Sequence, residues 1–391
     1  MRNRKEAGRD RIEESNVRSQ ASSCRMRSAK LVCRAYQSRR LLILLVILSL
    51  FLLGLLKGNI FKTDSYSLVW HVDPSHRKLV HSYVKSVLAK ECRPSFISKK
   101  MEAKGSGPRP VTEPFLYKDT HLSEEVFRYP PPFGFLDLQH KLKEILNLLP
   151  NSSDQKSERK GCQRCVVIGN GGILRGLELG SLLNQFDVVI RLNSGPVRNF
   201  TQDVGNRTSI RMSYPEGSPR NWDDIDPQLI FLMVIYKSVD FNWLRAIITK
   251  EKMSLWDSLF FWQKVPDKIP IDPSQFRILN LEIIRETAMD LLHYSTPKRR
   301  LWGWDQNVPT LGVSALNLAT YLCDEVSLAG FGYNLSQRGA PLHYYDNLPM
   351  TVMLDQGMHN VDRERAFLQS LVAAGTITDL TGGLHCSFCP R

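Results

Sequence analysis

The sequence predicts an α/β fold with a mostly parallel, doubly wound sheet flanked by helices. Short apolar runs rich in β-branched residues alternate with stretches whose apolar residues recur at helical spacing. The central run, 166–168, is followed by glycines and then by a helical pattern, which is the usual opening of a βαβ unit. About 300 residues follow the first 80, close to the limit of one hydrophobic core, so we expect one large domain.

The individual elements can be placed in order along the chain. Apolar residues at helical spacing before Pro150 predict a helix at 136–149. Strands are predicted at 166–168, 186–193, 208–214, 229–235, 276–279 and 326–329. Helices are predicted between them, among them 173–184 and 312–322.

The glycine-rich turn after residue 168 would present backbone N–H groups at the positive end of a helix, which suits a phosphate. A nucleotide ligand is the natural expectation. Two departures disfavour a dinucleotide-dependent enzyme: Leu174 stands where a third glycine belongs, and Asn193 ends the second strand where an acid would bind the ribose.

The formal net charge of +13 is concentrated at the amino terminus. Residues 1–40 carry twelve Lys or Arg against four acids, a net +8. A basic tail can indicate nucleic-acid binding, but this one adjoins sixteen residues without a charge, so we expect no nucleic-acid partner. The predicted organisation is a cytosolic tail at 1–40, a transmembrane signal anchor at 41–56, a stem at 57–80 and a lumenal catalytic domain at 81–391.

The anchor also predicts a location. Sixteen helical residues span about 24 Å, which suits the thinner membranes of the early secretory pathway and favours the Golgi membrane. The positive flank would keep the amino terminus cytosolic, as in a single-pass type II protein. A cleaved signal peptide is the alternative, but no small-residue cleavage site follows. A lumenal domain agrees with the glycosylation sequons at Asn151, Asn199, Asn206 and Asn334.

Four motifs follow one another along the chain. The stretch 162–214 contains Cys162-Gln-Arg-Cys165 and Gly169-Asn-Gly-Gly172, and the stretch 308–332 begins Val308-Pro-Thr-Leu-Gly312. His343-Tyr-Tyr-Asp346 and His359-Asn-Val-Asp-Arg-Glu364 come next. In this order they resemble the large, small, third and very small sialylmotifs of the animal sialyltransferases. The resemblance extends over about residues 70–384.

This resemblance implies a Rossmann-like, GT-A-variant catalytic domain that moves sialic acid from CMP-sialic acid to galactose with inversion. Likenesses at His71-Val-Asp-Pro74, Lys90-Glu-Cys-Arg-Pro94 and Lys237-Ser-Val-Asp240 imply the 3-hydroxyl of the terminal galactose of lactosylceramide, giving ganglioside GM3. Galactose on glycoproteins or other glycolipids is the first alternative. An inactive, membrane-anchored protein that binds a CMP-sugar or a glycan is an alternative of another class.

The resemblance also implies which residues bind the donor. They are Asn170, Gly171, Asn193, Thr310, Gly312, Gly332 and His343. Asn170 and Asn193 would follow neighbouring strands, at the edge where open α/β sheets bind ligands. The alternative is that both side chains only satisfy the backbone of their turns.

Two histidines and an acid carry the expected chemistry. His359 is the expected general base, because an imidazole of near-neutral pKa can take the proton of the acceptor hydroxyl. His343 is expected to stabilise charge on the leaving phosphate. Glu364 could support His359 if the fold joins them, since residues five apart are not neighbours on a helix. It could instead be a structural carboxylate.

Eight cysteines are divided between the two sides of the predicted anchor. By the resemblance, the expected disulfides are Cys165–Cys323 and Cys92–Cys162. Cys24 and Cys33 lie in the cytosolic tail, where thiols stay reduced. Cys386 and Cys389 depart from the ending expected for the family and could pair with each other. A zinc site built from the two Cys-x-x-Cys pairs is disfavoured by their long separation.

Asp224-Ile-Asp226 matches the DxD pair with which many sugar-nucleotide transferases hold a divalent cation. It lies in a turn-like acidic stretch, and the family that the chain resembles works without a metal. We interpret the pair as a solvated loop. Neither a metal nor a cofactor is expected.

Aromatic side chains concentrate near residues 243–262. They are Trp243, Trp256, Phe260, Phe261 and Trp262. Trp256, Leu259 and Phe260 fit one helical face, for which burial in the core is the default prediction. The alternative is an exposed surface that meets the ceramide end of a glycolipid at the membrane.

Overall fold

The computed structural model describes residues 44–49, 72–104, 113–155, 161–222, 226–296, 308–332, 341–348 and 359–389. The chain divides into two units, Met1–Ser67 and Leu68–Arg391, each considered by itself. In the first unit, residues 44–49 are helical. Within the described ranges, no helix has both the length and the apolar character required to cross a bilayer. The tail at 1–40 and the rest of the proposed anchor at 41–56 lie outside these ranges.

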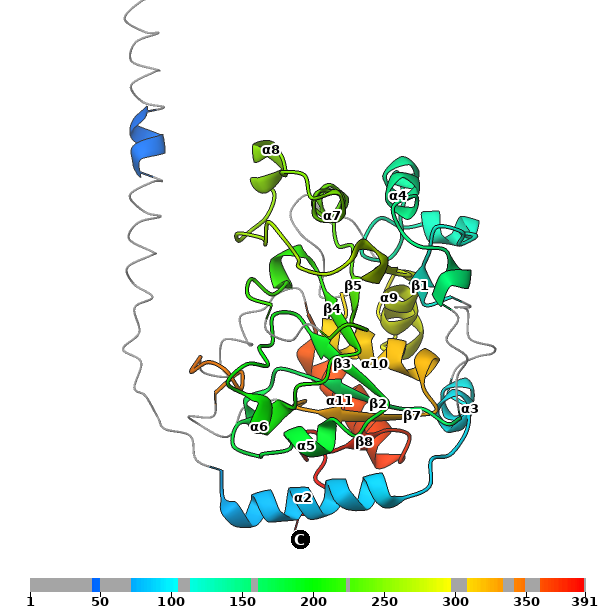
Figure 1. Cartoon of the computed structure of the whole chain (residues 1–391), viewed down its shortest axis with the longest axis vertical. Coiled ribbons are helices and arrows are strands. Elements are labelled where there is room, and N and C mark those ends of the chain that lie inside the picture. The colour runs from blue at the N-terminus through cyan, green and yellow to red at the C-terminus, as the bar shows by residue number, and fades with distance from the viewer. Residues whose placement is uncertain are drawn as a thin grey trace, which may run out of the picture. The chain divides into compact units, whose positions relative to one another are not determined.

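The second unit is organised around a mixed sheet that has eight strands within the described residues (Figure 1). Its strand order is β1-β6-β5-β4-β3-β2-β7-β8. The strands are β1 Phe115–Leu116, β2 Arg164–Ile168, β3 Val188–Leu192, β4 Ile210–Ser213, β5 Ile230–Met233, β6 Phe276–Leu279, β7 Glu325–Ala329 and β8 Thr378–Asp379. Among these, β1 is antiparallel to β6 and the other neighbours are parallel. The predicted mostly parallel α/β sheet is confirmed.

The chain winds in two directions from β2. It passes outward through β3, β4, β5 and β6, and then returns to the opposite side of β2 with β7. Strand order therefore reverses between β2 and β7. The crevice at such a reversal, beyond the carboxyl ends of the strands, is the usual ligand site of this kind of sheet.

Helices cover both faces of the sheet (Figure 1). They are α2 Pro74–Ala89, α3 Phe96–Glu102, α4 Gln139–Leu146, α5 Gly180–Leu183, α6 Thr201–Val204, α7 Val239–Thr249, α8 Leu255–Ser258, α9 Glu282–Glu286, α10 Leu311–Leu322 and α11 Val361–Ala373. In β2, Cys165 and Val167 join the apolar cluster that includes α10, while Val166 and Ile168 join the cluster that includes α2. Burial on both faces explains why strands such as β2 and β5 are mostly apolar.

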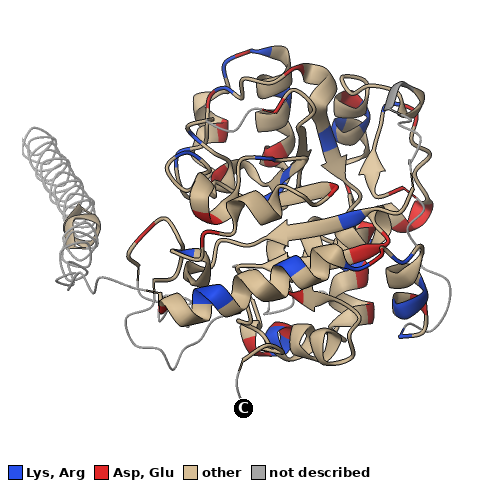
Figure 2. Cartoon of the chain, turned by 60° about the horizontal axis from the view of Figure 1, so that its bottom comes forward, with Lys and Arg blue, Asp and Glu red and all other residues tan. Residues whose placement is uncertain are grey.

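Helix α2 begins before residue 81, where the sequence suggested that the domain starts. Asp73 caps it by accepting a hydrogen bond from the backbone N–H of Ser75 at 2.9 Å, and Pro74 opens the first turn. Val80 and Val84 are fully buried. Lys and Arg are spaced along its outer side (Figure 2). The last part of the suggested stem, 74–80, therefore belongs to the folded unit.

The continuous helix predicted at 173–184 is not present. A 3-10 turn at Gly172–Leu174 and the short helix α5 take its place. Between them Gly176 has φ 80° and Glu178 has φ 56°, left-handed values that no α-helix contains. The glycine turn therefore does not lead into the long helix that would present its amino terminus to a phosphate.

Three disulfides occur in the described part of the chain: Cys92–Cys162, Cys165–Cys323 and Cys386–Cys389. The first two are the pairs that the family resemblance implies. The third joins Cys386 and Cys389, whose pairing the sequence did not decide. Cys165 lies in β2 and Cys323 caps the end of α10, two residues before β7, so the second disulfide lies beside the reversal of strand order. Cys24 and Cys33 lie outside the described residues.

Three of the four glycosylation sequons lie at exposed positions of the described chain. Asn151, Asn199 and Asn206 are exposed, so their side chains are accessible to a glycan. Asn334 lies outside the described residues. Glycosylation at all four sites stays a prediction.

Removing the disulfide between β2 and α10 should weaken the fold more than removing the carboxyl-terminal one. The sequence separation is 158 for Cys165–Cys323 and 3 for Cys386–Cys389, and a crosslink that closes a long loop restricts the unfolded chain more strongly. We expect the Cys165→Ala/Cys323→Ala variant to lose about 2–5 kcal/mol of unfolding free energy. Denaturant unfolding of this variant and of a Cys386→Ser/Cys389→Ser control measures the difference. Equal losses would contradict this account.

Candidate active site

The residues predicted to bind the donor meet at the carboxyl edge of the sheet. Asn170 lies two residues after β2, and Asn193 follows β3 directly. Gly330 follows β7, the other neighbour of β2. Both asparagines are therefore at the edge that the sequence predicted, next to the reversal of strand order.

Close packing holds the two asparagine side chains. Asn170 donates from its Nδ2 to the Leu192 carbonyl oxygen at 3.5 Å, and a side chain on Gly195 would collide with its Oδ1. Asn193, at φ 51°, accepts a hydrogen bond from the Ser213 hydroxyl at 3.3 Å. A Cβ on Gly217 would lie 2.5 Å from Asn193 Oδ1. Glycines thus let two loops approach the amides closely.

Arg211, in β4, fixes the loop that carries Asn193, and the sequence analysis missed it. Its side chain is buried, and its Nη1 donates to the carbonyl oxygens of Asn193 at 2.8 Å and Gly195 at 3.2 Å. A buried guanidinium requires such acceptors to offset its lost hydration. The signal in the sequence is an arginine in the middle of a buried strand.

The segment 341–348 is joined to the turn after β2. Gly171 and His343 form an antiparallel bridge, and Tyr344 donates its backbone N–H to the Asn170 carbonyl oxygen at 3.0 Å. The Tyr344 hydroxyl donates to the Pro196 carbonyl oxygen at 2.7 Å. The structure therefore brings two predicted donor residues, Gly171 and His343, side by side.

Asp346 orients the His343 ring. Its carboxylate Oδ2 lies 2.6 Å from His343 Nδ1, and the ring is stacked on Tyr345 with 5.0 Å between centroids. An ionised carboxylate can only accept, so Nδ1 carries the hydrogen in this bond. Nε2 is then the ring nitrogen left for a ligand.

His359 is held in the tautomer that a base requires. Its Nδ1 lies 2.8 Å from the Val308 carbonyl oxygen, which can only accept, so Nδ1 is the protonated nitrogen. Burial lowers the pKa of His359 below its ordinary value, and the bond to Val308 opposes this only in part. At neutral pH the ring is therefore neutral, with a lone pair on Nε2.

Glu364 binds Thr310 and not His359. The Thr310 backbone N–H donates to Oε1 at 2.7 Å and its hydroxyl donates to Oε2 at 2.5 Å. Thr310 in turn is the N-cap of α10. Desolvation raises the pKa of the Glu364 carboxyl to about 7. Of the two roles suggested by the sequence, the geometry supports the structural carboxylate: Glu364 joins the first turn of α11 to the start of α10.

The glycines of the small motif are explained by packing. A Cβ on Gly312 would lie 2.9 Å from the Phe331 ring. Gly332 has φ 96°, and a side chain there would collide with the backbone of Gly383. Direct contact of either residue with the donor stays a prediction.

A buried acidic group lies beside the Asn193 loop and was not found from the sequence. Glu216 is buried and forms an ion pair with Lys237, which also lies 3.7 Å from Asp240 Oδ1. Asp240 accepts hydrogen bonds from the backbone N–H groups of Tyr236 and Lys237 at the start of α7. Burial raises the pKa of Asp240 to about 7, with Lys237 acting in the opposite direction.

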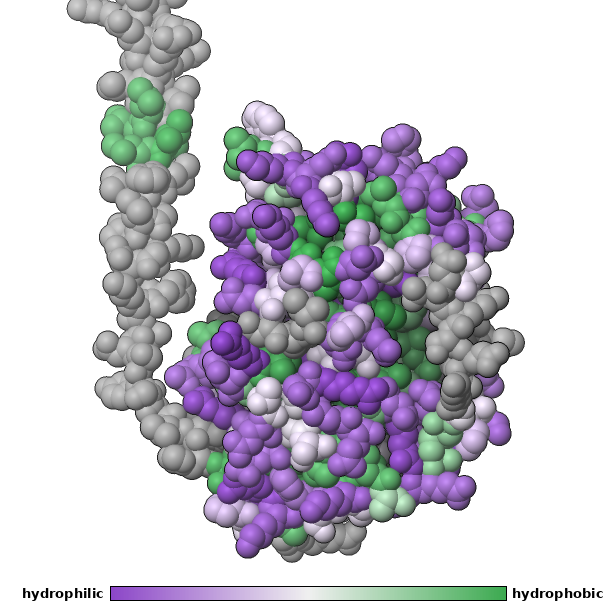
Figure 3. Space-filling model, viewed as in Figure 1, coloured by the Kyte–Doolittle hydropathy of each residue, from purple (hydrophilic) through white to green (hydrophobic). Residues whose placement is uncertain are grey.

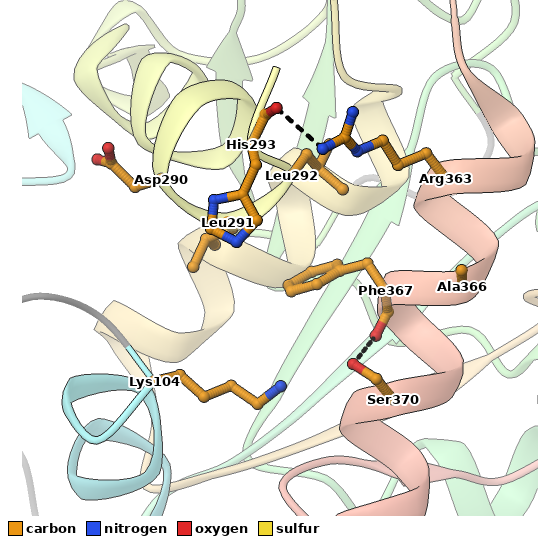
Figure 4. A pocket seen from close by; sticks show the side chains of 9 residues that line it. All are labelled: Lys104, Asp290, Leu291, Leu292, His293, Arg363, Ala366, Phe367 and Ser370. Atoms are coloured by element: carbon orange, nitrogen blue, oxygen red, sulfur yellow. Dashed lines mark hydrogen bonds between the residues drawn. The ribbon is translucent and has the colours of Figure 1, made fainter. Parts of the chain in front are cut away.

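A separate cavity of about 330 Å³ lies between α11 and the segment that ends at His293 (Figure 4). Arg363 crosses one side and donates to the His293 carbonyl oxygen at 2.9 Å, while Lys104 and Phe367 face it from below. Its lining contains none of the predicted donor residues. The cavity is therefore distinct from the carboxyl edge of the sheet.

Of the DxD pair, Asp226 is among the described residues. Asp224 lies outside the described residues. Asp226 accepts a hydrogen bond from the backbone N–H of Gln228 at 3.0 Å, which is a turn contact.

The default prediction for the aromatic segment is wrong for most of its residues. Trp243 and Phe261 are buried as expected, but Trp256, Phe260 and Trp262 are 76, 68 and 70 % exposed. Both Trp256 and Phe260 point to solvent, and Phe260 lies beyond α8, which ends at Ser258. The alternative of an exposed surface fits these three residues.

The family follows from comparison with known proteins. The model of glycosyltransferase family 29 (sialyltransferase) matches residues 115–376. The chain belongs to this family of sialyltransferases. The match spans β1 to α11 and so includes both asparagines, His343 and the Glu364–Thr310 contact.

Individual sialyltransferases are similar over most of the chain. A lactosylceramide alpha-2,3-sialyltransferase of Rattus norvegicus is 48% identical over 345 residues, covering 88% of this chain and 89% of that protein. The Homo sapiens protein of the same name is 49% identical over 348 residues, covering 88% and 83%. A Homo sapiens CMP-N-acetylneuraminate-beta-1,4-galactoside alpha-2,3-sialyltransferase is 37% identical over 297 residues, covering 75% and 77%.

A solved structure has the same fold. The crystal structure of a mammalian sialyltransferase in complex with Gal-beta-1-3GalNAc-ortho-nitrophenol superposes with a TM-score of 0.56 at 21% identity. The superposition covers 74% of this chain and 97% of the other. This likeness agrees with the sheet and helix arrangement described above.

Glu364 should make the stability of this sialyltransferase depend on pH. The pKa of Glu364 is about 7 in the folded protein, above the ordinary value of 4.5, so between these values the native protein binds a proton that the unfolded chain has lost. The contribution of Glu364 to stability is therefore fully present below about pH 4.5 and is lost as pH rises through about 7. We expect Glu364→Gln, which does not titrate, to gain roughly 1–3 kcal/mol relative to the wild type from pH 4.5 to 8.

Denaturant unfolding across this range measures the effect. Asp362→Asn changes an exposed acid in the same turn of α11 and serves as the control. A Glu364→Gln variant whose stability follows the wild type in parallel at every pH would contradict the role assigned to this carboxyl.

Proposed function

We propose that this sialyltransferase transfers sialic acid from CMP-sialic acid to the 3-hydroxyl of the terminal galactose of lactosylceramide, forming ganglioside GM3. The observation that carries the proposal is 48% and 49% identity, over 88% of the chain, to lactosylceramide alpha-2,3-sialyltransferases. The galactoside alpha-2,3-sialyltransferase, at 37% identity, is named for the same alpha-2,3 linkage. Its lower identity makes a galactoside other than lactosylceramide the less favoured acceptor.

The donor would bind at the carboxyl edge between β2 and β7. Asn170 and Asn193 would offer amide groups to the CMP portion, and Gly171 permits close approach of backbone. The start of α10, at Thr310, adds the positive end of a twelve-residue helix. His343, with Nδ1 engaged by Asp346, would direct Nε2 at the phosphate.

The reaction is an in-line displacement with inversion. The acceptor 3-oxygen attacks the anomeric carbon of sialic acid as the bond from that carbon to the phosphate oxygen breaks. The electron pair of that bond leaves with CMP, and the hydroxyl proton passes to His359 Nε2. Stabilising charge that develops on the leaving phosphate is the role of His343.

His359 is suited to act as the base at neutral pH. The Val308 carbonyl oxygen fixes the hydrogen on Nδ1, and burial keeps the ring neutral by lowering its pKa. A neutral imidazole with a free Nε2 can accept a proton without first losing one. Glu364 would contribute by holding α11, which begins two residues after His359, against Thr310.

The proposal includes a location and a metal-free reaction. The apolar segment 41–56 would anchor the protein in the Golgi membrane as a type II protein with the domain in the lumen. Disulfides and exposed sequons are compatible with an oxidising, glycosylating compartment. The residues proposed for the chemistry are histidines and amides, and no carboxylate pair is assigned to a cation.

The acceptor is tested with the full chain in membranes, CMP-sialic acid and EDTA. We expect sialylation of lactosylceramide and little transfer to a desialylated glycoprotein. Transfer to the glycoprotein alone would show that the chain is a sialyltransferase whose acceptor is galactose on glycoproteins and not lactosylceramide. Loss of all activity in EDTA, restored by Mn²⁺ or Mg²⁺, would contradict the metal-free reaction.

The base is tested by His359→Ala. We expect kcat to fall by roughly 10²–10⁴-fold while the protein stays folded and still binds CMP. In the wild type, kcat/KM should fall on the acid side as His359 is protonated, with an apparent pKa below that of a free histidine. The control His385→Ala changes an exposed histidine near the carboxyl terminus. A His359→Ala variant with most of its rate intact would rule out this assignment.

A further inference from the structure

The surface around α8 exposes an unusual number of large apolar side chains. These five residues, here called the α8 patch, are Leu255, Trp256, Leu259, Phe260 and Trp262. They are between 68 and 86 % exposed and lie within the eight positions 255–262. Figure 3 shows apolar and pale side chains protruding at the upper left edge, where Figure 1 has α8. Isolated exposed apolar residues are ordinary, but a contiguous group marks a contact surface.

In this segment a polar side chain points toward the protein and most of the apolar side chains point to solvent, which is the reverse of a helix that covers a core. Asp257, the polar member, faces the protein and accepts a hydrogen bond from Asn242 Nδ2 at 3.0 Å. Phe261 is the buried member, with the Lys237 ammonium 4.7 Å from its ring centroid. Asp257 and Phe261 fill the positions that face the protein, so the five residues of the patch face solvent.

Several contacts hold this segment in its exposed position. Ser254 caps α8 by accepting from the Trp256 N–H at 3.2 Å. Beyond the patch, Gln263 donates to the Glu216 carbonyl oxygen, and Arg220 donates to the Lys264 carbonyl oxygen at 3.0 Å. A surface presented in a fixed conformation loses little entropy when it binds.

We propose that the α8 patch inserts into the lumenal leaflet of the membrane that holds the lipid acceptor. This inference rests on the proposed function. Exposed Trp, Phe and Leu side chains close together in the chain are typical of segments that lie in the membrane interface. The stretch 250–268 contains four lysines and three acids, a net charge of +1, which is compatible with contact with lipid headgroups.

The position of the patch near the candidate site makes such insertion useful. Phe261 contacts Lys237, Lys237 is paired with Glu216, and Gly217 packs against Asn193 of the proposed donor site. The α8 patch is therefore linked to the candidate site through Lys237 and Glu216. The galactose of a glycolipid extends only a short way from its ceramide, so the site has to approach the leaflet closely.

The first test measures insertion without reference to activity. The full chain is reconstituted in vesicles whose lipids carry bromine on the acyl chain close to the headgroup, and tryptophan fluorescence is recorded. Trp256→Leu/Trp262→Leu keeps the patch apolar but removes two of the seven tryptophans. We expect brominated lipid to quench the wild type more than this variant. Equal quenching would overturn the proposal.

The second test separates insertion from chemistry. Trp256→Ser/Phe260→Ser/Trp262→Ser should lose roughly tenfold or more in kcat/KM for lactosylceramide in vesicles, through KM, and keep its rate with water-soluble methyl β-lactoside. Leu79→Ser/Leu136→Ser, which changes exposed leucines elsewhere, is the matched control. No loss, or the same loss with both acceptors, would overturn the proposal. A wild type that is quenched but sialylates neither lactose-containing acceptor would instead refute the proposed function.

Discussion

The close approach of β2 and β7 is the constraint on which the candidate site depends. The Gly171 N–H donates to the Gly330 carbonyl oxygen at 3.1 Å, and a Cβ on Gly171 would lie 2.5 Å from that oxygen. Only glycine lets the two strand ends meet this closely. Cys165–Cys323 adds a covalent link between β2 and the end of α10, two residues before β7. Because Asn170 and the bridge to His343 follow from this contact, two motifs far apart in sequence form one edge.

A second connection extends from this edge to the carboxyl-terminal part of the chain. Glu364 binds both the backbone and the hydroxyl of Thr310, so the start of α11 is fixed against the start of α10. His359 is held by Val308, two residues before Thr310. Desolvation of the Glu364 carboxyl opposes its ionisation, and the two hydrogen bonds offset part of that cost. The very small motif therefore fixes the position of the proposed base, and its acid has no contact with the imidazole.

The sequence predicted elements whose signal is local and missed features that depend on tertiary contacts. Apolar runs gave the buried strands, and β6 matches its predicted range of 276–279 because both faces are covered. The helix at 173–184 failed since the left-handed values at Gly176 and Glu178 interrupt it. Asn170, Asn193 and the histidines were identified from motif order. Arg211 and Glu216 were not: an arginine within an apolar strand is a visible signal, but the role of either charge follows only from its acceptors and ion-pair partners.

The aromatic segment shows that helical spacing can group side chains but does not determine whether the group is buried or exposed. Spacing groups Trp256 with Phe260, but whether such a group is buried depends on what the neighbouring residues contact, and α8 itself ends at Ser258. Here Asp257 and Phe261 occupy the inward positions through Asn242 and Lys237, so the larger apolar face has no room within the domain. Keeping this face in water is unfavourable unless something covers it. For an enzyme whose proposed acceptor is a lipid, the membrane surface is the partner whose chemistry fits.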